Sequence, residues 1–510
     1  MKTDFNLIHL PEPQLVFGHG QTMEDPRHGL TLLGPYEARE NYSVNYGVIG
    51  TVDGIRRLRD WIQKVKTPIS EGGKTQGRPP FPGFEAAFGI AWNSEPQAVI
   101  EIEEQALLRV VNIDDVNKRV HETVGFFMSR LVKHTKNEDV TPTLWIVVLP
   151  DVVKTRCRPK STVPFFERVK TVAAISKKEA RAVASGDKFL FEEFNQAAEP
   201  YLHEPDFHNQ LKGRLLKHGL LTQIVLESTI AHHEFLKSNG RPLKDYGTML
   251  SQIAWNLSSA IYYKVAGRPW KLDGVRPGVC YLGLVFKKDD KSKKAEDACC
   301  AAQMFLNSGD GVVFKGHHGP WYSPDTQQFH LDRKEAEDLL AKAISSYRET
   351  HDDQVPTEVF IHGRTHFDDE EWTGFERAAG NQTNVVGVRI VDAKNLRFYR
   401  LNSGQPVMRG MAWIQGERLA MLMTRGYLPS LGTYPGMEVP LPLEVTIIRG
   451  EADIKQVLQD IMGLTKLNYN SCRFADGDPV TLKFADAVGE VLLSGPKNEE
   501  TIPLPFKHYI

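Results

Sequence analysis

Short, uninterrupted apolar runs constrain this sequence more than any other feature. The run from Leu144 to Leu149 (LWIVVL) has no polar position and stops at Pro150. A strand of a parallel sheet is covered on both faces, so it is typically a continuous apolar run of this kind. Such runs alternate with stretches at helical spacing, for example residues 112–134. The alternation predicts an α/β fold with parallel strands.

Other segments are assigned from composition and spacing. Many Gly and Pro residues between 66 and 85 predict a loop. Residues 175–200 are polar, which predicts a peripheral position. Further helices are predicted at 53–65, 332–351 and 369–380, and further strands at 47–51, 84–92 and 396–401.

Charge is unevenly distributed along the chain. The net charge of -2 gives no overall signature of nucleic-acid binding, yet residues 208–276 contain ten Lys and Arg against four Asp and Glu. A basic groove can lie within a neutral total. Five cysteines without CxxC spacing fit a reducing compartment. We expect a cytoplasmic protein without a membrane partner, because there is no signal-peptide pattern and no apolar run near the ~18 residues that span a bilayer.

The basic segment contains a spacing that suits an anion. His208 and Lys212 are four residues apart in a helical stretch, so the two side chains lie on one face, one turn apart. Gln223 follows a glycine-containing turn, and Lys264 lies near the end of a second predicted helix, 245–265. Together they match the charge and acceptor oxygens of a terminal phosphate. From spacing alone, solvated helix faces are the more common explanation, with Lys264 complementing a helix dipole.

The order of these four residues resembles the guide 5′-phosphate motif of Argonaute MID domains. In that family the motif begins with Tyr, His or Arg and continues with Lys, Gln and a second Lys on the next helix. The resemblance implies a Mg²⁺ ion held by the terminal carboxylate, here that of Ile510, with a frayed terminus as the alternative. Asn256 is a further candidate for guide contact. Four other segments add to the resemblance, which covers most of the chain: FGHG (17–20), YYKVAGRPW (262–270), GVCYLG (278–283) and AAQMFLNSGDGVVFKG (301–316).

The second half of the chain resembles a PIWI domain, which has an RNase H-like fold. Active members hold two metal ions with acidic side chains at strand ends. Where their first strand carries Asp, this sequence has Val285, and where their second carries Asp, it has Gly363. The residues nearest to the last acidic position are Asn468 and Asn470. The resemblance therefore implies an inactive nuclease with no catalytic residues.

Acidic residues near these positions lie in charge runs, which favours a solvated surface over a replacement metal site. They are Asp289, Asp290, Asp368 and Asp369. No GxGxxG after a strand, GxxxxGK[ST], HExxH or GxSxG motif offers another chemistry.

The position of the phosphate motif predicts the domain order. Residues 1–85 would pack on both domains, residues 86–270 would form a Rossmann-like MID domain, and residues 271–510 the PIWI domain. The stretch before residue 208 is too short for a PAZ domain as well.

This architecture resembles the short prokaryotic Argonautes. The resemblance implies a 5′-phosphorylated guide RNA, a single-stranded DNA target and an APAZ-containing partner. The partner would carry a TIR, SIR2 or nuclease effector that is activated in defence against plasmids and phage, with NAD depletion in the first two cases. The alternatives are a guide-loaded binding module without an effector, an Argonaute nuclease with an atypical metal site, and an unrelated RNase H-like or Rossmann-like protein.

Overall fold

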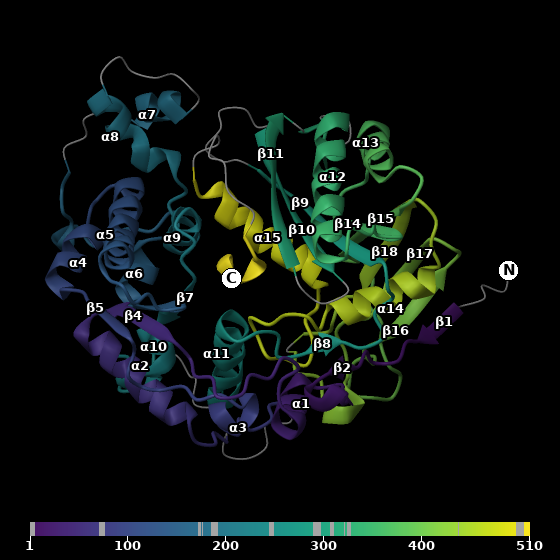
Figure 1. Ribbon diagram of the computed structural model, residues 1–510, viewed down its shortest axis with the longest axis horizontal. Coiled ribbons are helices and arrows are strands. Elements are labelled where there is room, and N and C mark those ends of the chain that lie inside the picture. Colours follow the sequence, from purple (N-terminus) through teal and green to yellow (C-terminus); the bar gives the residue numbers. More distant parts are fainter. Residues whose placement is uncertain are drawn as a thin grey trace.

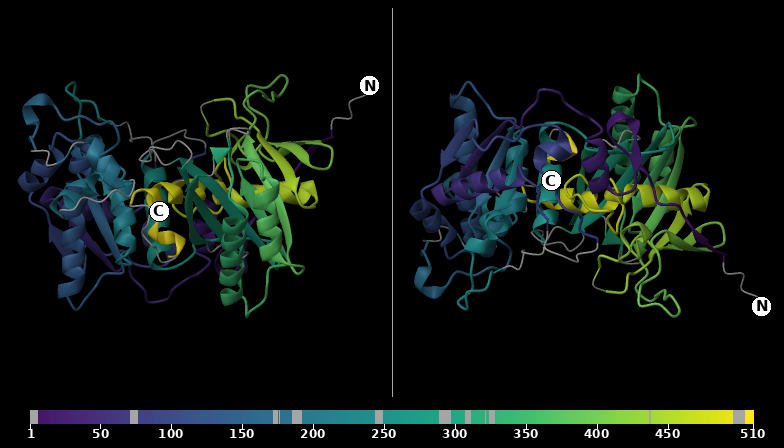
Figure 2. Two further views of the ribbon diagram at one scale, coloured as in Figure 1. Left: turned by 90° about the horizontal axis from the view of Figure 1, so that it is seen from above. Right: turned by 90° about the horizontal axis from the view of Figure 1, so that it is seen from below.

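The chain folds into two lobes, and each is built on one large sheet (Figures 1 and 2). In Figure 2 the C-terminal segment lies between the lobes in both views. The computed structural model describes residues 6–70, 77–171, 175, 177–184, 192–243, 249–288, 297–306, 311–320, 322–323, 328–436, 438–495 and 504–510.

The first lobe contains a four-stranded parallel sheet in the order β5-β4-β6-β7. Its strands are β4 (Tyr46–Gly50), β5 (Ala98–Glu101), β6 (Leu144–Leu149) and β7 (Thr222–Leu226). Its helices are α2 (Val52–Val65), α4 (Glu104–Val111), α5 (Val116–Asn137), α6 (Asp151–Arg156), α7 (Lys177–Ala184), α8 (Glu192–Leu202), α9 (Phe207–Leu216) and α10 (Glu227–Ile230).

The apolar run 144–149 forms β6, the second of the two central strands, and all of its residues are buried. This confirms the predicted buried parallel strand. The predicted helix 112–134 is also confirmed, as α5. Residues 175–200 contribute α7 and α8, which lie at the outer edge of the lobe in Figure 1.

The second lobe contains a nine-stranded sheet in the order β1-β16-β17-β18-β15-β14-β9-β10-β11. Its strands are β1 (Asn6–His9), β9 (Val279–Lys288), β10 (Asp297–Leu306), β11 (Gly311–Pro320), β14 (Glu358–Gly363), β15 (Asn384–Asp392), β16 (Met411–Gln415), β17 (Leu419–Leu422) and β18 (Leu443–Arg449). Its helices are α12 (Arg333–Thr350), α13 (Asp369–Ala379), α14 (Ile454–Leu464) and α15 (Val480–Leu493).

Five neighbouring strands of this sheet have the RNase H arrangement. β9, β10 and β11 are antiparallel, and β14 and then β15 continue from β9 in parallel. α12 and α13 pack on one face, where Leu282 and Leu284 of β9 point. α15 covers the other face, and Gly283 allows its close approach because a side chain there would collide with the carbonyl oxygen of Thr481. The predicted helices 332–351 and 369–380 are confirmed as α12 and α13.

Smaller elements complete the chain. A three-stranded sheet pairs β2 with both β3 and β8, so it joins the N-terminal segment to residues that follow the first lobe. These elements are β2 (Leu15–Val16), β3 (Thr22–Met23), β8 (Lys271–Leu272), β12 (Tyr322–Ser323), β13 (Gln328–Phe329), α1 (Pro26–Leu33), α3 (Phe84–Phe88), α11 (Leu250–Val265), η1 (Gly18–Gly20), η2 (Phe165–Glu167), η3 (His232–Glu234), η4 (Pro429–Leu431) and η5 (Phe506–His508).

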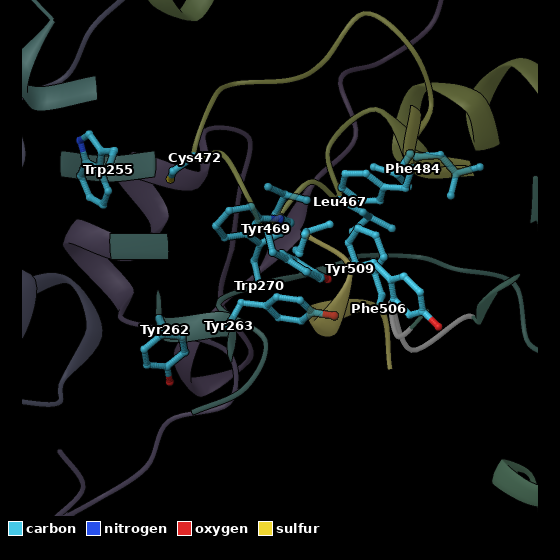
Figure 3. Close-up of a cluster of buried hydrophobic side chains, with 14 of the residues drawn as sticks. Trp255, Tyr262, Tyr263, Trp270, Leu467, Tyr469, Cys472, Phe484, Phe506 and Tyr509 are labelled. Atoms are coloured by element: carbon cyan, nitrogen blue, oxygen red, sulfur yellow. The ribbon is translucent and has the colours of Figure 1, made fainter. Parts of the chain in front are cut away.

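An aromatic cluster joins the lobes around α11 (Figure 3). Tyr263 of α11 packs on Tyr469, with ring centroids 4.8 Å apart. Trp270 is fully buried beside Tyr469, and its indole N–H donates to the carbonyl oxygen of Lys466 at 3.0 Å. Phe506 of the C-terminal segment lies 4.1 Å from Phe484 of α15, centroid to centroid. The two lobes therefore share one continuous core.

The predicted strand at 84–92 is wrong. Residues 84–88 form α3, and Gly83 and Gly89 bound it with φ angles of 110° and 68°. Phe84 and Phe88 are one turn apart and both are buried, so these apolar residues form the buried face of a short helix.

The predicted strand at 396–401 is also wrong, because these residues form no strand. Tyr399 and Leu401 are 72% and 89% exposed, so the apolar side chains of this stretch cover no core.

The expected boundary between residues 85 and 86 cuts through the first sheet. β4 precedes that point, yet it lies between β5 and β6. The N-terminal segment thus contributes β4 and α2 to the first lobe, while β1 pairs with β16 in the second. In the described part of the chain, no helix is both long and apolar enough to cross a membrane.

Replacing Trp270 by Ala removes a fully buried indole at the junction of the lobes. We expect the free energy of unfolding to fall by ~3–5 kcal/mol, because a large aromatic cavity forms and a buried carbonyl loses its donor. Denaturant titration of the wild type and the variant measures this. The matched control is Tyr399→Ala at an exposed site, where a change within about 0.5 kcal/mol is expected. Equal losses for the two variants would contradict the role of the cluster.

Candidate functional site

Two helices bring two lysine side chains into one buried site. α9 begins after Asp206, whose carboxylate accepts a hydrogen bond from the Asn209 N–H at 3.0 Å. Lys212 lies in the middle of α9 and Lys264 in the last turn of α11. Both side chains are buried, with 2% and 1% exposure.

The two ammonium groups share their acceptors. Lys212 Nζ donates to the main-chain oxygens of Thr222 and Ile510, each at 2.7 Å. Lys264 Nζ donates to the same two oxygens at 3.0 and 2.6 Å. It also donates to Gln223 Oε1 at 2.7 Å. The structure thus brings together Lys212, Gln223, Lys264 and Ile510, and in Figure 1 the chain end lies between α9, α11 and α15. We call this set the lysine site.

Burial strongly affects the ionisation of both lysines. It lowers the pKa of Lys212 to about 7. It lowers the pKa of Lys264 well below the usual value, and the nearby charge of Lys212 adds to this effect. No Asp or Glu side chain in the described residues forms an ion pair with either ammonium group. A bound anion would therefore relieve two unfavourable charges at once.

Two histidines flank the lysine site. The His208 side chain lies at the exposed start of α9, and its Nδ1 is 3.1 Å from Asn209 Oδ1. Desolvation, followed by the charge of Lys212, lowers the pKa of the His208 imidazole. His508, from the C-terminal segment, has a pKa lowered to about 4 by desolvation and by the charges of Lys507, Lys212 and Lys264.

Sequence reasoning missed His508 and the carbonyl oxygen of Thr222. The His508 side chain carries no spacing signal, because it reaches the site only through the folding of the C-terminal segment. A main-chain acceptor such as Thr222 leaves no signal in residue identity.

Asn256 is not part of the lysine site. It lies on α11 two turns before Lys264, and its Oδ1 accepts from the Cys472 N–H at 3.0 Å and from Gln252 at 2.8 Å. Asn256 therefore holds the loop of residues 466–478 against α11.

A basic cavity of about 450 Å³ lies at the opposite end of α11. Gln252 lines it, about 18 Å of helix from Lys264. Arg27 and Lys483 are each paired with an Asp, at 2.7 and 2.8 Å. Arg425 and Arg473 are exposed. The cationic residues that line the cavity are Arg27, Arg78, Arg409, Arg425, Arg473 and Lys483, and the acidic ones are Asp476 and Asp478.

The architecture is similar to that of solved Argonaute structures. Argonaute of Clostridium butyricum, bound to a guide DNA and a 19-mer target DNA, matches 98% of this chain with a TM-score of 0.62 and 13% identity. A. aeolicus Argonaute matches 98% with a TM-score of 0.55 and 14% identity, and Drosophila Piwi matches 98% with 0.57 and 13%. The chain has the MID and PIWI fold of Argonaute proteins. It spans 55–56% of the length of these three proteins. No family model and no curated protein matches the sequence.

The first lobe is therefore the MID lobe, with a parallel, Rossmann-like sheet, and the second is the PIWI lobe, with the RNase H-like sheet. The lysine site lies where α9 and β7 of the MID lobe meet α11 and the C-terminal segment.

Val285 and Gly363 do not lie side by side in the PIWI lobe, as a shared metal site would require. Gly363 is opposite Leu284 in the parallel register of β14 and β9. A side chain at Gly363 would point at the ring of Phe367, 3.1 Å away, on the face that α12 and α13 cover. Val285 is buried on the α15 face. By this register the two positions face opposite sides of the sheet, because neighbouring residues of a strand point to opposite faces.

The α15 face carries cations at this end of the sheet. Arg364, directly after β14, lies 3.5 Å from both Asp478 and Asp486. Lys287 of β9 pairs with Asp486 at 3.0 Å. The carboxylates that α15 presents here are thus paired with protein side chains.

The other candidate acids have local roles. Asp368 caps α13 by accepting from the Glu371 N–H at 2.8 Å, and Asp369 pairs with Arg449. Asp289 and Asp290 lie outside the described residues. Asn468 donates to Asp476 at 2.7 Å and accepts from the Asn470 N–H at 3.0 Å, so both Asn residues order the 466–478 loop.

A divalent ion does not suit the lysine site on its own. The oxygens present already accept from ammonium groups, and two nearby positive charges oppose a third. Among the described residues, one group close enough to hold a metal is His121, Glu199 and His203, in the MID lobe. Arg214 lies 3.5 Å from His121 Nδ1. Its positive charge beside this nitrogen opposes the binding of a metal ion there. Binding of Mg²⁺ at the lysine site therefore stays a prediction, and it requires the guide phosphate as a further ligand.

The lysine site should make stability depend on pH. Because the pKa of Lys212 falls from 10.5 to about 7 on folding, the unfolded chain binds the extra proton between these values, and stability rises with pH in that window. Lys212→Met should reduce this rise. Denaturant unfolding of both proteins at pH 7, 8, 9 and 10 measures the slopes, and parallel slopes would show that Lys212 keeps its usual pKa.

Proposed function

We propose that this chain binds the 5′-phosphate of a guide strand at the lysine site. The observation that carries the proposal is the pair of buried ammonium groups that share two main-chain oxygens, those of Thr222 and Ile510, without an acidic side-chain partner. A terminal phosphate supplies up to two negative charges and three acceptor oxygens. Gln223 offers an amide beside Lys264, and the exposed His208, one turn before Lys212 on α9, would contact the first nucleotide.

The guide would continue along α11 toward the basic cavity. Asn256 lies between the lysine site and the cavity, Gln252 lines the cavity, and Arg425 and Arg473 offer exposed guanidinium groups there. Contacts to the phosphate backbone position a strand and leave the base edges free. Sequence recognition would then come from Watson–Crick pairing with the target, as in other guided systems.

The Argonaute resemblance supports a guide RNA and a single-stranded DNA target. Argonaute of Clostridium butyricum was solved with DNA in both roles, which makes a DNA guide the alternative for this chain. Mg²⁺ would join the site only with the guide phosphate, sharing the oxygen of Ile510 that both lysines contact.

We further propose that the PIWI lobe does not cut the target. Val285 offers no ligand, Gly363 faces away from it, and Arg364 and Lys287 neutralise the carboxylates of α15. This arrangement disfavours the alternative of a nuclease with an atypical metal site, because cations occupy the face on which metal ions would bind.

Activity would then reside in a partner. By resemblance, an APAZ protein with a TIR, SIR2 or nuclease effector responds to target pairing in defence against invading nucleic acid. A guide-loaded module without an effector is the second candidate. Copurification of this chain from its native operon distinguishes these two candidates, because only the effector hypothesis requires an APAZ protein in the complex.

Lys212→Ala should weaken binding of a 5′-phosphorylated guide by about 10- to 100-fold, since one charge-assisted hydrogen bond contributes ~1.5–3 kcal/mol. Binding of the same strand with a 5′-hydroxyl should change little. Fluorescence anisotropy with both strands gives the two affinities, and the salt dependence of the phosphorylated strand should also decrease.

Lys217→Ala is the matched control, because Lys217 is an exposed lysine at the end of the same helix. This substitution should lower the affinity for both strands equally and only slightly. If Lys212→Ala lowers the affinity for the 5′-phosphorylated strand and for the 5′-hydroxyl strand by the same factor, the lysine site does not recognise the phosphate.

The purified wild-type chain, loaded with guide, should leave a complementary target intact in Mg²⁺ or Mn²⁺. Val285→Asp should remain inactive, because the carboxylates nearest on its face, Asp478 and Asp486, are already paired with Arg364 and Lys287. Gel analysis of labelled target over hours measures this. Metal-dependent cleavage by the wild type would refute the assignment of an inactive lobe.

A further inference from the structure

The loop of residues 158–170, here the aromatic loop, exposes two phenylalanines to solvent. It follows α6, and Phe165 and Phe166 are 71% and 97% exposed. The two rings meet edge to face, with centroids 5.7 Å apart. Adjacent large apolar side chains are rarely left so open without a binding role.

Cationic residues flank these rings in the sequence of the loop. Arg158, Lys160, Arg168 and Lys170 have exposed side chains. The guanidinium carbon of Arg168 lies 5.8 Å from the centroid of the Phe165 ring. The one acid of the loop, Glu167, pairs with Arg156 at 2.7 Å and so does not offset the exposed charges.

The aromatic loop is held in place by a buried arginine. Arg119 of α5 is fully buried and donates to the carbonyl oxygens of Arg156 at 2.8 Å and Ser161 at 2.9 Å. Val169 pairs with Ile113 at the other end of the loop. Both ends of the loop that carries the two rings are therefore fixed to the rest of the MID lobe.

The loop also begins beside the lysine site. The Phe207 N–H donates to the carbonyl oxygen of Cys157 at 3.0 Å. Phe207 is the first residue of α9 and precedes His208. Nucleic acid that passes the 5′ end of a guide at the lysine site therefore approaches the base of the aromatic loop.

We propose that the aromatic loop binds the unpaired target strand beyond the guide's 5′ end. This inference rests on the proposed function. Because the strands are antiparallel, the target nucleotides that continue past the guide's 5′ end are on the 3′ side of the paired segment. Exposed rings stack on bases of any sequence, and cations on either side of them contact the backbone. This chemistry favours a single strand over an acidic protein, because the adjacent rings match its bases and the flanking cations match its phosphates.

Three targets test the proposal with a guide-loaded chain: one flush with the guide, one with a 3′ single-stranded extension, and one with a 5′ extension. The 3′ extension should tighten binding by about tenfold or more in the wild type, as expected for stacking of one or two bases. The 5′ extension should not. Phe165→Ser/Phe166→Ser should lose the gain while binding the flush target as the wild type does.

The control is Tyr399→Ser/Leu401→Ser, which removes two exposed apolar side chains from the PIWI lobe. It should retain the gain. A 3′ extension that brings no gain in the wild type, or a gain that survives in the phenylalanine variant, overturns the proposal. Loss of a copurifying protein from the phenylalanine variant with the gain intact would instead assign the loop to protein docking.

Binding of unphosphorylated oligothymidine separates this inference from the proposed function. If the wild type fails to prefer a 5′-phosphorylated guide, the lysine-site proposal fails. The aromatic loop is still tested, because the phenylalanine variant should bind oligothymidine several-fold more weakly than the wild type and the control. Equal binding by all three proteins overturns it.

Discussion

Two like charges held together away from water are the constraint on which this structure depends. Lys212 and Lys264 would repel each other at low dielectric, and they remain together because the main-chain oxygens of Thr222 and Ile510 accept from both. These groups come from α9, β7, α11 and the C-terminal segment. The site therefore exists only when both lobes and the chain end are in place, which makes it a property of the whole fold.

The core that joins the lobes makes this placement rigid. α11 buries Trp255, Tyr262 and Tyr263 and carries Lys264 in its last turn. Its neighbours Trp270 and Tyr469 complete the cluster of Figure 3, and Phe506 attaches the C-terminal segment to α15. Because aromatic side chains fill this junction at the density of a protein interior, movement of one lobe against the other would disturb the contacts that hold the two ammonium groups.

The sequence allowed the α/β class and the positions of both lysines to be predicted, because helical spacing and apolar runs are local signals. It did not reveal that the lysines share acceptors, since main-chain oxygens have no residue signature. The assignment of 84–92 to a strand failed because flanking glycines closed a helix around the same apolar residues. Val285 and Gly363 were each identified by motif, but only the register of β9 and β14 shows that they face opposite sides of the sheet. Register is a long-range property that no single segment contains.

The edge of the PIWI sheet next to α15 is charged. Arg364 and Lys287 bring fixed positive charge to Asp478 and Asp486. Asp478 is the last residue of the loop 466–478, whose Cys472 N–H is bonded to Asn256 of α11 and whose Arg473 lines the basic cavity. Displacement of this loop must therefore disturb contacts on α11 and at the end of β14 together. The loop thus connects the basic cavity to the charged edge of the PIWI sheet.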